Sequence, residues 1–343
     1  MGRRFRVQSG IIGLLIGAAC VAILLRQVDL KQSWSALGQL NGPYLLIPLI
    51  VFCVNLPLRA WRWQTIFPSS ARPSFWSCLT VLGIGNMANF LLPARAGDIS
   101  RCALVGPQAT LSDSTRALGT LAVEKVLDGL ALIGMVLLAV WALNPPIWVL
   151  RILRVAIALF GTGLLLLVLL RYRTRTLISV ATKPLRYIGL HSLEKKINDL
   201  LNSFADGLTA VDSWGNLLLL LIFTATIWTT EAALIWGLAG ALNTPVALKS
   251  AVVVSAVLGL GLMIPAGPGG LGTYELFGTK AFQLVGLSAS NGLALTVVIH
   301  AWVFLANILA GIALLGVKGL SLAQLKTRIE DGAVPAVRSS VDT

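Results

Sequence analysis

The sequence predicts an all-α polytopic membrane protein, with about six crossing helices plus two re-entrant broken-helix pairs in an inverted repeat. First, 56% of the 343 residues are hydrophobic and only 12% are charged. Second, several apolar stretches reach the roughly 20 residues that cross a hydrocarbon core of ~30 Å. Third, segments beginning at Pro93 and Pro265 share the pattern Pro-Ala-x-x-Gly and interrupt apolar sequence at matching places in the two halves, as in repeat-built transporters.

We expect the crossing helices in six apolar stretches, at residues 10–25, 43–63, 117–143, 155–170, 215–242 and 291–317. The first stretch is interpreted as a retained anchor instead of a cleaved signal peptide, because no small-residue cleavage site follows it and five further apolar stretches do. No other window is polar and long enough to predict a soluble domain.

Basic residues flank these stretches and predict the topology. The formal net charge is +13. The flanks expected in the cytoplasm carry Arg3, Arg4, Arg6, Arg59, Arg62, Arg72, Arg171, Arg173, Arg175, Lys183, Arg186, Lys195, Lys196, Lys318, Lys326 and Arg328. The opposite side receives Arg26, Lys31, Arg151, Arg154 and Lys249. Because Lys and Arg are enriched in cytoplasmic loops, we expect a multi-pass protein of the cell inner (cytoplasmic) membrane, with both termini cytoplasmic and Asn144 outside. No basic groove with aromatic platforms is apparent, so no nucleic-acid partner is expected.

Each half contains two apolar segments that are short for a crossing. In the first half they are residues 75–92 and 99–105, separated by 93–98. In the second half they are 251–264 and 274–285, separated by 265–272, where Gly269, Gly270 and Gly272 permit positive φ and close backbone approach. Irregular backbone at membrane depth is tolerated only beside protein or a water-filled cavity, so each pair predicts a re-entrant hairpin.

The two halves are related by an offset of 172 residues (265 − 93). The same offset pairs Arg59 with Glu231 and Asp128 with His300, so polar positions recur together with the broken segments. Three crossings separate the corresponding helices, which makes the predicted repeat inverted. The expected organisation is a first span and outer loop (1–42), repeat 1 (43–143), a fourth span and cytoplasmic basic/amphipathic linker (144–214), repeat 2 (215–317) and a cytoplasmic tail (318–343).

The linker carries apolar residues at helical spacing, namely Leu193, Ile197, Leu200, Leu201, Phe204, Leu208 and Val211. This spacing predicts an amphipathic helix, which either lies on the membrane surface or packs against the cytoplasmic ends of the crossing helices. The end of the tail, residues 332–343, is expected to be disordered.

Charged residues in the first broken segment are candidates for substrate binding. Arg95 and Asp98 must face protein or water, because a charge facing lipid at the bilayer centre costs at least ~2.5 kcal/mol. In one interpretation the two side chains pair with each other and hold the loop. In the other, Arg95 and the N–H groups of a half-helix starting near Gly97 bind an anionic group such as a lipid phosphate, and Arg101 widens that site or approaches the cytoplasmic interface.

The third crossing stretch carries a second cluster. Glu124 and Asp128 lie one turn apart on one face, and Lys125 is close enough to neutralise Asp128. At 1.5 Å per residue from Ala117, Asp128 lies about 16 Å deep, near the midplane. Ionisable residues at this depth are candidate functional groups. The structural alternative is a Lys125–Asp128 pair with Glu124 bonded to the first broken segment.

Three ionisable residues in the second half complete the candidate set. His300 falls near the middle of its stretch, Glu231 lies toward the outer end of its own, and Glu275 follows the glycine segment. A neutral histidine bonded to a neighbour is one interpretation, and a proton-coupled step through His300, Glu231 or Asp128 is the other. Cys20, Cys53, Cys78 and Cys102 are scattered without metal-ligand spacing, and no nucleotide-binding pattern is present, so no metal or cofactor is expected.

Three ordered motifs carry a family resemblance: Pro93-x-Arg95-x-Gly97-Asp98-x-x-Arg101, Glu124-Lys125-x-x-Asp128 and Pro265-x-x-Pro268-Gly269-Gly270-x-Gly272-x-x-Glu275. Over roughly residues 43–317 the chain resembles the lysylphosphatidylglycerol synthase transmembrane (flippase-like) family. The resemblance implies a lipid flippase built from inverted repeats with re-entrant helices. Some members carry a fused soluble aminoacyl-transfer domain, which we do not expect here. Asp98 stands where Glu is common and Lys125 where Arg is common, which changes reach and hydrogen-bonding geometry and leaves the substrate open.

Together these features predict a protein that moves an anionic or zwitterionic phospholipid, or a lipid-linked headgroup, between leaflets and that catalyses no bond formation. One alternative is an intramembrane lipid-headgroup transferase using Glu124 and Asp128, although no soluble donor-binding element accompanies them. Another is a non-transporting membrane partner of a lipid-synthesis enzyme, which needs no charge at the midplane. Homo-oligomer formation is not readable from the sequence.

Overall fold

The computed structural model describes residues 41–92, 95–105, 110–142, 146–187, 190–263 and 267–317, and all regular structure in these ranges is helical. Several predictions concern residues outside these ranges: the crossing stretch at 10–25 with its basic flank, Pro93, Asn144, Pro265 and the basic tail after Val317.

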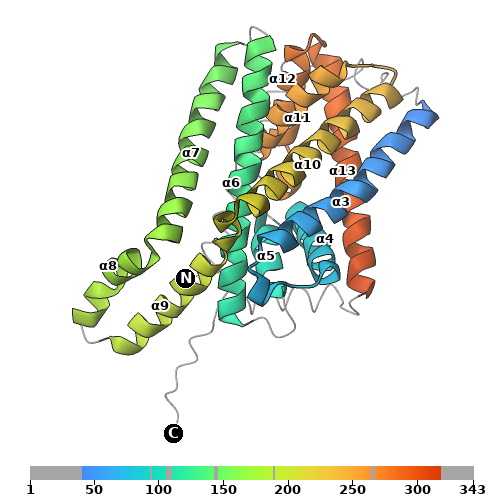
Figure 1. Ribbon diagram of the computed structural model, residues 1–343. Coiled ribbons are helices and arrows are strands. Elements are labelled where there is room, and N and C mark those ends of the chain that lie inside the picture. Colours follow the sequence, from blue (N-terminus) through green and yellow to red (C-terminus); the bar gives the residue numbers. More distant parts are fainter. Residues whose placement is uncertain are drawn as a thin grey trace.

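The helices follow the order expected for two halves joined by a linker (Figure 1). The first half contains η2 (Gly42–Leu45), α3 (Leu46–Ile66), η3 (Ser69–Ala71), α4 (Phe75–Leu91), α5 (Ala96–Leu104) and α6 (Leu111–Ala142). The linker contains α7 (Ile147–Tyr172), α8 (Thr174–Tyr187), α9 (His191–Asp206) and η5 (Thr209–Asp212). The second half contains α10 (Trp214–Ala241), α11 (Leu248–Leu262), η6 (Pro268–Gly270), α12 (Thr273–Leu284) and α13 (Ala289–Val317).

Within the described ranges, four helical segments are long and apolar enough to cross a membrane, namely 42–66, α7, α10 and α13. Helix α6 has 32 residues, which is about 48 Å at 1.5 Å per residue. The shorter apolar helices α4 and α11 have 17 and 15 residues. An all-helical, multi-pass membrane protein is therefore confirmed, whereas the number of six crossings and the re-entrant path stay predictions.

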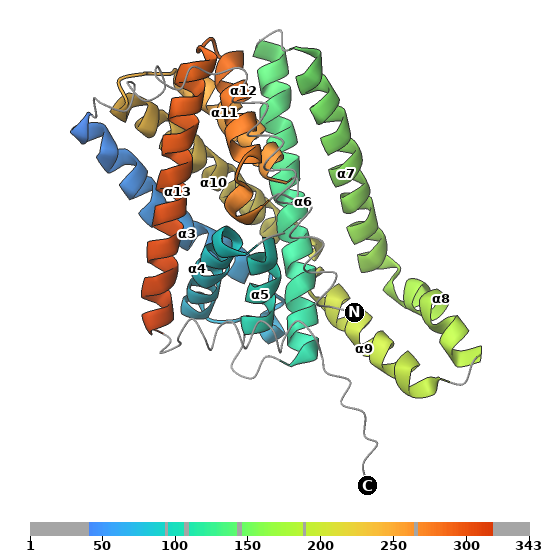
Figure 2. The same ribbon diagram turned by 180° about the vertical axis from the view of Figure 1, so that it is seen from behind.

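The helices of the two halves have corresponding neighbours. Helix α3 packs on its counterpart α10, the α4–α13 contact corresponds to α11–α6, and the α5–α6 contact corresponds to α12–α13. In both views α4 and α5 lie toward one end of the bundle, and α11 and α12 toward the other (Figures 1 and 2). This arrangement is the one that an inverted repeat with a 172-residue offset would produce.

The linker packs on the first half instead of standing free. Ser112 Oγ of α6 lies 2.6 Å from Ser203 Oγ of α9. Glycines allow the two backbones to meet, because a Cβ at Gly119 would lie 2.2 Å from the Phe204 carbonyl oxygen. The predicted amphipathic helix, α9, therefore packs against a crossing helix, α6, which is one of the two expected arrangements. It also ends earlier than expected, at Asp206, so Leu208 and Val211 follow it in or near a short 3₁₀ turn.

Apolar packing positions the first broken-helix pair. Trp63 of α3 is completely buried and packs with Leu82 of α4 and Cys102 of α5. Its indole N–H donates to Thr120 Oγ1 of α6 at 3.0 Å, so one side chain links four helices. Cys78 and Cys102 are buried and free, as expected of small core residues, and Cys53 is exposed and free.

Candidate functional site

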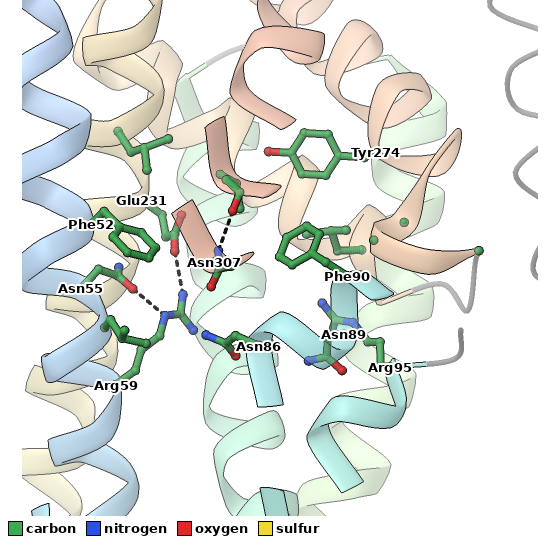
Figure 3. Close-up of a pocket in the computed structure, with 17 residues that line it drawn as sticks. Phe52, Asn55, Arg59, Asn86, Asn89, Phe90, Arg95, Glu231, Tyr274 and Asn307 are labelled. Atoms are coloured by element: carbon green, nitrogen blue, oxygen red, sulfur yellow. Dashed lines mark hydrogen bonds and ion pairs between the residues drawn. The ribbon is translucent and has the colours of Figure 1, made fainter. Parts of the chain in front are cut away.

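A cavity of about 200 Å³, lined by both polar and apolar side chains, opens where the two halves meet (Figure 3). Helices α3, α4, α10, α11, α12 and α13, together with Arg95 and the segment 267–270, form its walls, so both halves contribute. Its lining includes two arginines, a glutamate, four asparagines and three aromatic rings: Phe52, Asn55, Arg59, Asn86, Asn89, Phe90, Arg95, Glu231, Tyr274 and Asn307. A space of this size accommodates a headgroup and not a whole lipid, since pockets for drug-sized ligands are about 300–1,000 Å³.

Arg95 occupies an unusual backbone position at this cavity. It is the residue that precedes α5, and its φ of 53° lies in the left-handed region, which non-glycine residues rarely adopt. Its side chain is exposed and has no hydrogen bond or ion pair with any described residue. The expected Arg95–Asp98 pair is therefore not formed.

The start of α5 is instead held by α4. Asn89 Oδ1 accepts a hydrogen bond from the Asp98 N–H, and Asn89 Nδ2 donates to Asp98 Oδ1, both at 3.1 Å. A Cβ at Gly97 would lie 2.0 Å from the Gly85 carbonyl oxygen, so only glycine permits this approach. The local sequence thus fixes the half-helix that presents Arg95 to the cavity.

Behind Arg95, a network of ion pairs joins α3, α5 and α6. Lys125 Nζ lies 2.8 Å from Asp98 Oδ2, and Arg101 Nη2 lies 2.7 Å from Glu124 Oε1. These contacts replace the expected Lys125–Asp128 pair, and Glu124 is bonded to Arg101 of α5, three residues beyond the first broken segment, instead of to that segment itself. Spacing along α6 suggested that Lys125 pairs with Asp128, but helix packing places Asp98 of α5 within 2.8 Å of Lys125 instead.

The partner of Asp128 is Arg62, which the sequence placed among the cytoplasmic basic residues. That assignment is wrong, because Arg62 is fully buried and binds Asp128 through both Nη atoms, at 2.6 and 3.1 Å. Trp228 Nε1–H also donates to Asp128, at 3.2 Å. A signal for this pair existed: Arg62 lies within the second apolar stretch, where a charge needs an opposite partner.

The cluster is electrically balanced. Three acids, Asp98, Glu124 and Asp128, face three bases, Arg62, Arg101 and Lys125. Buried charges are tolerated when they are paired in this way. Because the cluster compensates itself, Arg95 is left as a cation facing the cavity without a partner among the described residues.

Arg59 and Glu231 meet at the crossing of α3 and α10. Arg59 Nη2 lies 2.8 Å from Glu231 Oε1, and Arg59 Nε donates to Asn55 Oδ1 at 2.6 Å. Figure 3 shows this pair on one side of the cavity and Arg95 on the other. The two positions related by the 172-residue offset are thus in direct contact, and Arg59, which the sequence placed in a basic flank, lies inside α3 and lines the cavity.

The glycine segment of the second half adopts the expected backbone. Gly269, Gly270 and Gly272 have φ values of 65°, 77° and 84°. Gly272 precedes α12, and its N–H donates to Glu275 Oε2 at 2.6 Å. Glu275 Oε1 lies 2.5 Å from Nδ1 of His300, so Glu275 links the start of α12 to α13.

The predicted site residues fall into three groups. Arg59, Arg95, Glu231, Gly269 and Gly270 line the cavity. A neighbouring cavity of about 180 Å³ is lined by Lys125 and Asp128 and shares with the first Arg59, Arg95, Glu231 and Tyr274. The others, Asp98, Arg101, Glu124, Gly272, Glu275 and His300, lie outside both linings. No cluster of potential metal ligands occurs in the described ranges.

Sequence reasoning missed five polar lining residues. Asn55 lies on α3, Asn86 and Asn89 on α4, Asn307 on α13 and Tyr274 on α12. The asparagines could have been found, because amide side chains inside apolar membrane segments are costly unless they meet other polar groups. Tyr274 directly precedes Glu275, but its position facing the cavity depends on how α12 packs.

Comparisons with known proteins agree with this arrangement. A family model described as the lysylphosphatidylglycerol synthase TM region matches residues 10–311. A protein named glycosyltransferase AglD, from Haloferax volcanii, is 27% identical over 126 residues, which cover 36% of this chain and 20% of that protein. The match thus spans about a fifth of that relative's length. No solved structure matches the chain.

Proposed function

The chain belongs to the family of the lysylphosphatidylglycerol synthase TM region, and we propose that it is a lipid flippase. In this proposal it moves an anionic or zwitterionic phospholipid, or a lipid-linked headgroup, between the leaflets of the inner membrane. Six helices cross the bilayer, α4–α5 and α11–α12 enter from opposite sides as re-entrant pairs, and both termini are cytoplasmic.

The observation that carries the proposal is Arg95 at the cavity, whose side chain makes no hydrogen bond or ion pair with a described residue. A guanidinium binds phosphate oxygens through two parallel N–H bonds, and the N-terminus of α5 beside it favours negative charge. In a chain whose other central charges are paired, this cation is suited to an anionic ligand. A lipid phosphate is the anion that a membrane-embedded site would meet.

The neighbouring cavities supply a route for the headgroup. They share Arg59, Arg95, Glu231 and Tyr274, so a ligand can pass from one to the other without leaving the contact range of both arginines. Helix ends and glycine backbone border this region, as expected where irregular structure lines a polar path. Acyl chains would remain in the bilayer, since the cavity is too small to hold them.

The transferase alternative is weakened by the pairing of its two candidate carboxylates. Glu124 is bonded to Arg101 and Asp128 to Arg62, and both acids are almost completely buried. An acid or base must reach its substrate within hydrogen-bond distance, which these contacts obstruct. The glycosyltransferase relative is matched over too little of its length to support that activity here.

The direct test is leaflet exchange of a labelled phospholipid in vesicles containing the purified protein. We expect Arg95→Gln to fold normally and to lower exchange roughly tenfold to a hundredfold, because losing a hydrogen bond to a charged group costs about 1.5–3 kcal/mol. Arg173→Gln is the matched control, since Arg173 is exposed at the end of α7. Equal exchange by wild type and Arg95→Gln would remove Arg95 from the mechanism. If no candidate lipid is exchanged, the alternative of a non-transporting membrane partner of a lipid-synthesis enzyme would be favoured.

The topology has a separate test. Single cysteines placed at Arg151 and Lys196, both exposed, should react from opposite sides of the membrane in intact cells, in a background without the native cysteines. Reaction from the same side would contradict both the six-crossing arrangement and the inversion.

A further inference from the structure

The glycine wall of the cavity is held by hydrogen bonds that run through two ionisable side chains. At one end the Gly272 N–H donates to Glu275, whose other oxygen contacts Nδ1 of His300 at 2.5 Å. At the other end Nε2 of His300 lies 3.0 Å from the carbonyl oxygen of Gly269. This chain of contacts, which we call the His–Glu clamp, ties both ends of segment 269–272 to α13.

The geometry determines how many protons the clamp contains. A carbonyl oxygen only accepts hydrogen bonds, so Nε2 of His300 carries a proton in its contact with Gly269. The contact between Nδ1 and Glu275 then needs another proton, because a bare ring nitrogen and an ionised carboxylate are both acceptors. His300 and Glu275 together therefore hold one proton more than a neutral histidine beside an ionised glutamate. This extra proton lies on Nδ1 of His300 or on Oε1 of Glu275.

The residues around His300 and Glu275 shield this proton from most water but leave both side chains partly accessible. The His300 and Glu275 side chains are 6% and 14% exposed. Tyr274 of α12 stacks on the His300 ring, with 4.3 Å between the ring centroids, and the ring of Phe90 from α4 lies 6.3 Å away. Helix α13 carries no other ionisable side chain. His300 and Glu275 do not line the cavity, and the clamp reaches it through Gly269 and the neighbouring Tyr274. The charged groups that line the cavity are Arg59 of α3, Arg95 at the start of α5 and Glu231 of α10.

We propose that His300 and Glu275 form a proton-binding site that couples lipid movement to a proton gradient. The inference rests on the proposed flippase function and adds its energy source. A proton enters from cavity water, binds between Nδ1 and Oε1, and returns to water on the other side of the membrane after the headgroup has moved. The N–H or O–H bond that holds this proton forms and breaks once per cycle, no covalent bond of the lipid changes, and one proton accompanies each cycle.

The clamp connects proton binding to the headgroup site. When the proton leaves, two acceptors face each other and the His300–Glu275 contact is lost. The Gly272 end of segment 269–272 is then released from α13, whereas Nε2–H of His300 still donates to the Gly269 carbonyl oxygen. Because Gly270 lies between these two ends and lines the cavity, the shape of the lipid site changes. The positive φ angles of these glycines allow such a backbone change at low cost.

The proton can be detected directly because the sequence contains only two histidines. In protein with ¹⁵N-labelled histidine, His191 provides an internal reference, since its side chain is 74% exposed. For His300 at neutral pH we expect a protonated Nε2, together with either a protonated Nδ1 or a protonated carboxyl band in infrared spectra that Glu275→Gln removes. A bare Nε2, or the absence of a proton on both Nδ1 and Glu275, would overturn the inference.

The coupling is tested in vesicles of phosphatidylcholine and labelled phosphatidylglycerol with a gradient of one pH unit. One proton per lipid supports a leaflet ratio of up to about tenfold, whichever way the protein is inserted. We expect wild type and His191→Gln to shift the ratio, and His300→Gln and Glu275→Gln not to shift it. Wild-type exchange that ignores the gradient, or a shift retained by either clamp variant, would refute coupling alone. Absence of all wild-type exchange would refute the flippase proposal too, while the spectra would still establish or exclude the proton site.

Discussion

The two broken-helix regions hold irregular backbone by different means. The first, between α4 and α5, is backed by the balanced ion pairs of α3, α5 and α6 and by the close contact of Gly85 with Gly97. The second, between α11 and α12, relies on glycines at positive φ and on the His–Glu clamp. Paired, mostly buried charges resist separation, whereas a hydrogen-bond chain that needs one proton can be opened. The comparison contrasts a fixed side, which presents Arg95, with an adjustable side, which carries the His–Glu clamp.

The largest expected effect is on the fixed side. Arg62→Leu should destabilise the protein by about 3–5 kcal/mol, because it leaves Asp128 buried without its charge partner. Thermal unfolding in detergent would measure the loss. The double variant Arg62→Leu, Asp128→Leu removes both charges and should recover most of the stability. A single variant as stable as wild type would show that water reaches this pair.

A smaller effect on folding, with a large effect on transport, is expected on the adjustable side. The double variant Gly269→Val, Gly270→Val forces two side chains into the left-handed region at about 1–2 kcal/mol each. It should lose lipid exchange because both residues line the cavity. Gly286→Val is the matched control, since Gly286 has φ 95° with no atom near its Cβ position and lies away from the cavity. Wild-type exchange by the double variant would indicate an ordinary surface turn.

The helices and glycine positions were predictable from sequence, but the ionic partners were not. Apolar length and the Pro/Gly interruption predicted a segment at 75–92, and the observed α4 is Phe75–Leu91. The positive φ angles at Gly269 and Gly270 were expected because glycine lacks a Cβ. Lys125 was assigned to Asp128 because spacing along one helix reveals only neighbours within that helix. The actual partners come from α3 and α5, and their choice depends on how the helices pack.

The helix contact on the fixed side can be weakened without touching a charge. Gly97→Ala places a Cβ 2.0 Å from the Gly85 carbonyl oxygen and 2.6 Å from the Asn89 nitrogen. Both are backbone atoms, so the helices must separate, at about 1–3 kcal/mol for overpacking. Gly134→Ala, where no atom lies within 4 Å, should instead stabilise α6 by about 0.5–1 kcal/mol. Equal unfolding temperatures for the two variants would contradict the close α4–α5 contact.

The smallest expected effect concerns Arg59 and Glu231, where the two halves meet. Their side chains are 23% and 30% exposed, against 1% and 7% for Arg62 and Asp128. Water therefore screens the first pair, and a double-mutant cycle with Arg59→Gln and Glu231→Gln should give a coupling energy of about 0–1 kcal/mol in unfolding measurements. A coupling of about 3 kcal/mol or more would mean that the cavity is dry and that the pair locks the two halves together. A weak coupling would instead leave Arg59 free to release Glu231 and bind a headgroup that already contacts Arg95. Passage of a headgroup between the two cavities requires this exchange, because both cavities contain these residues.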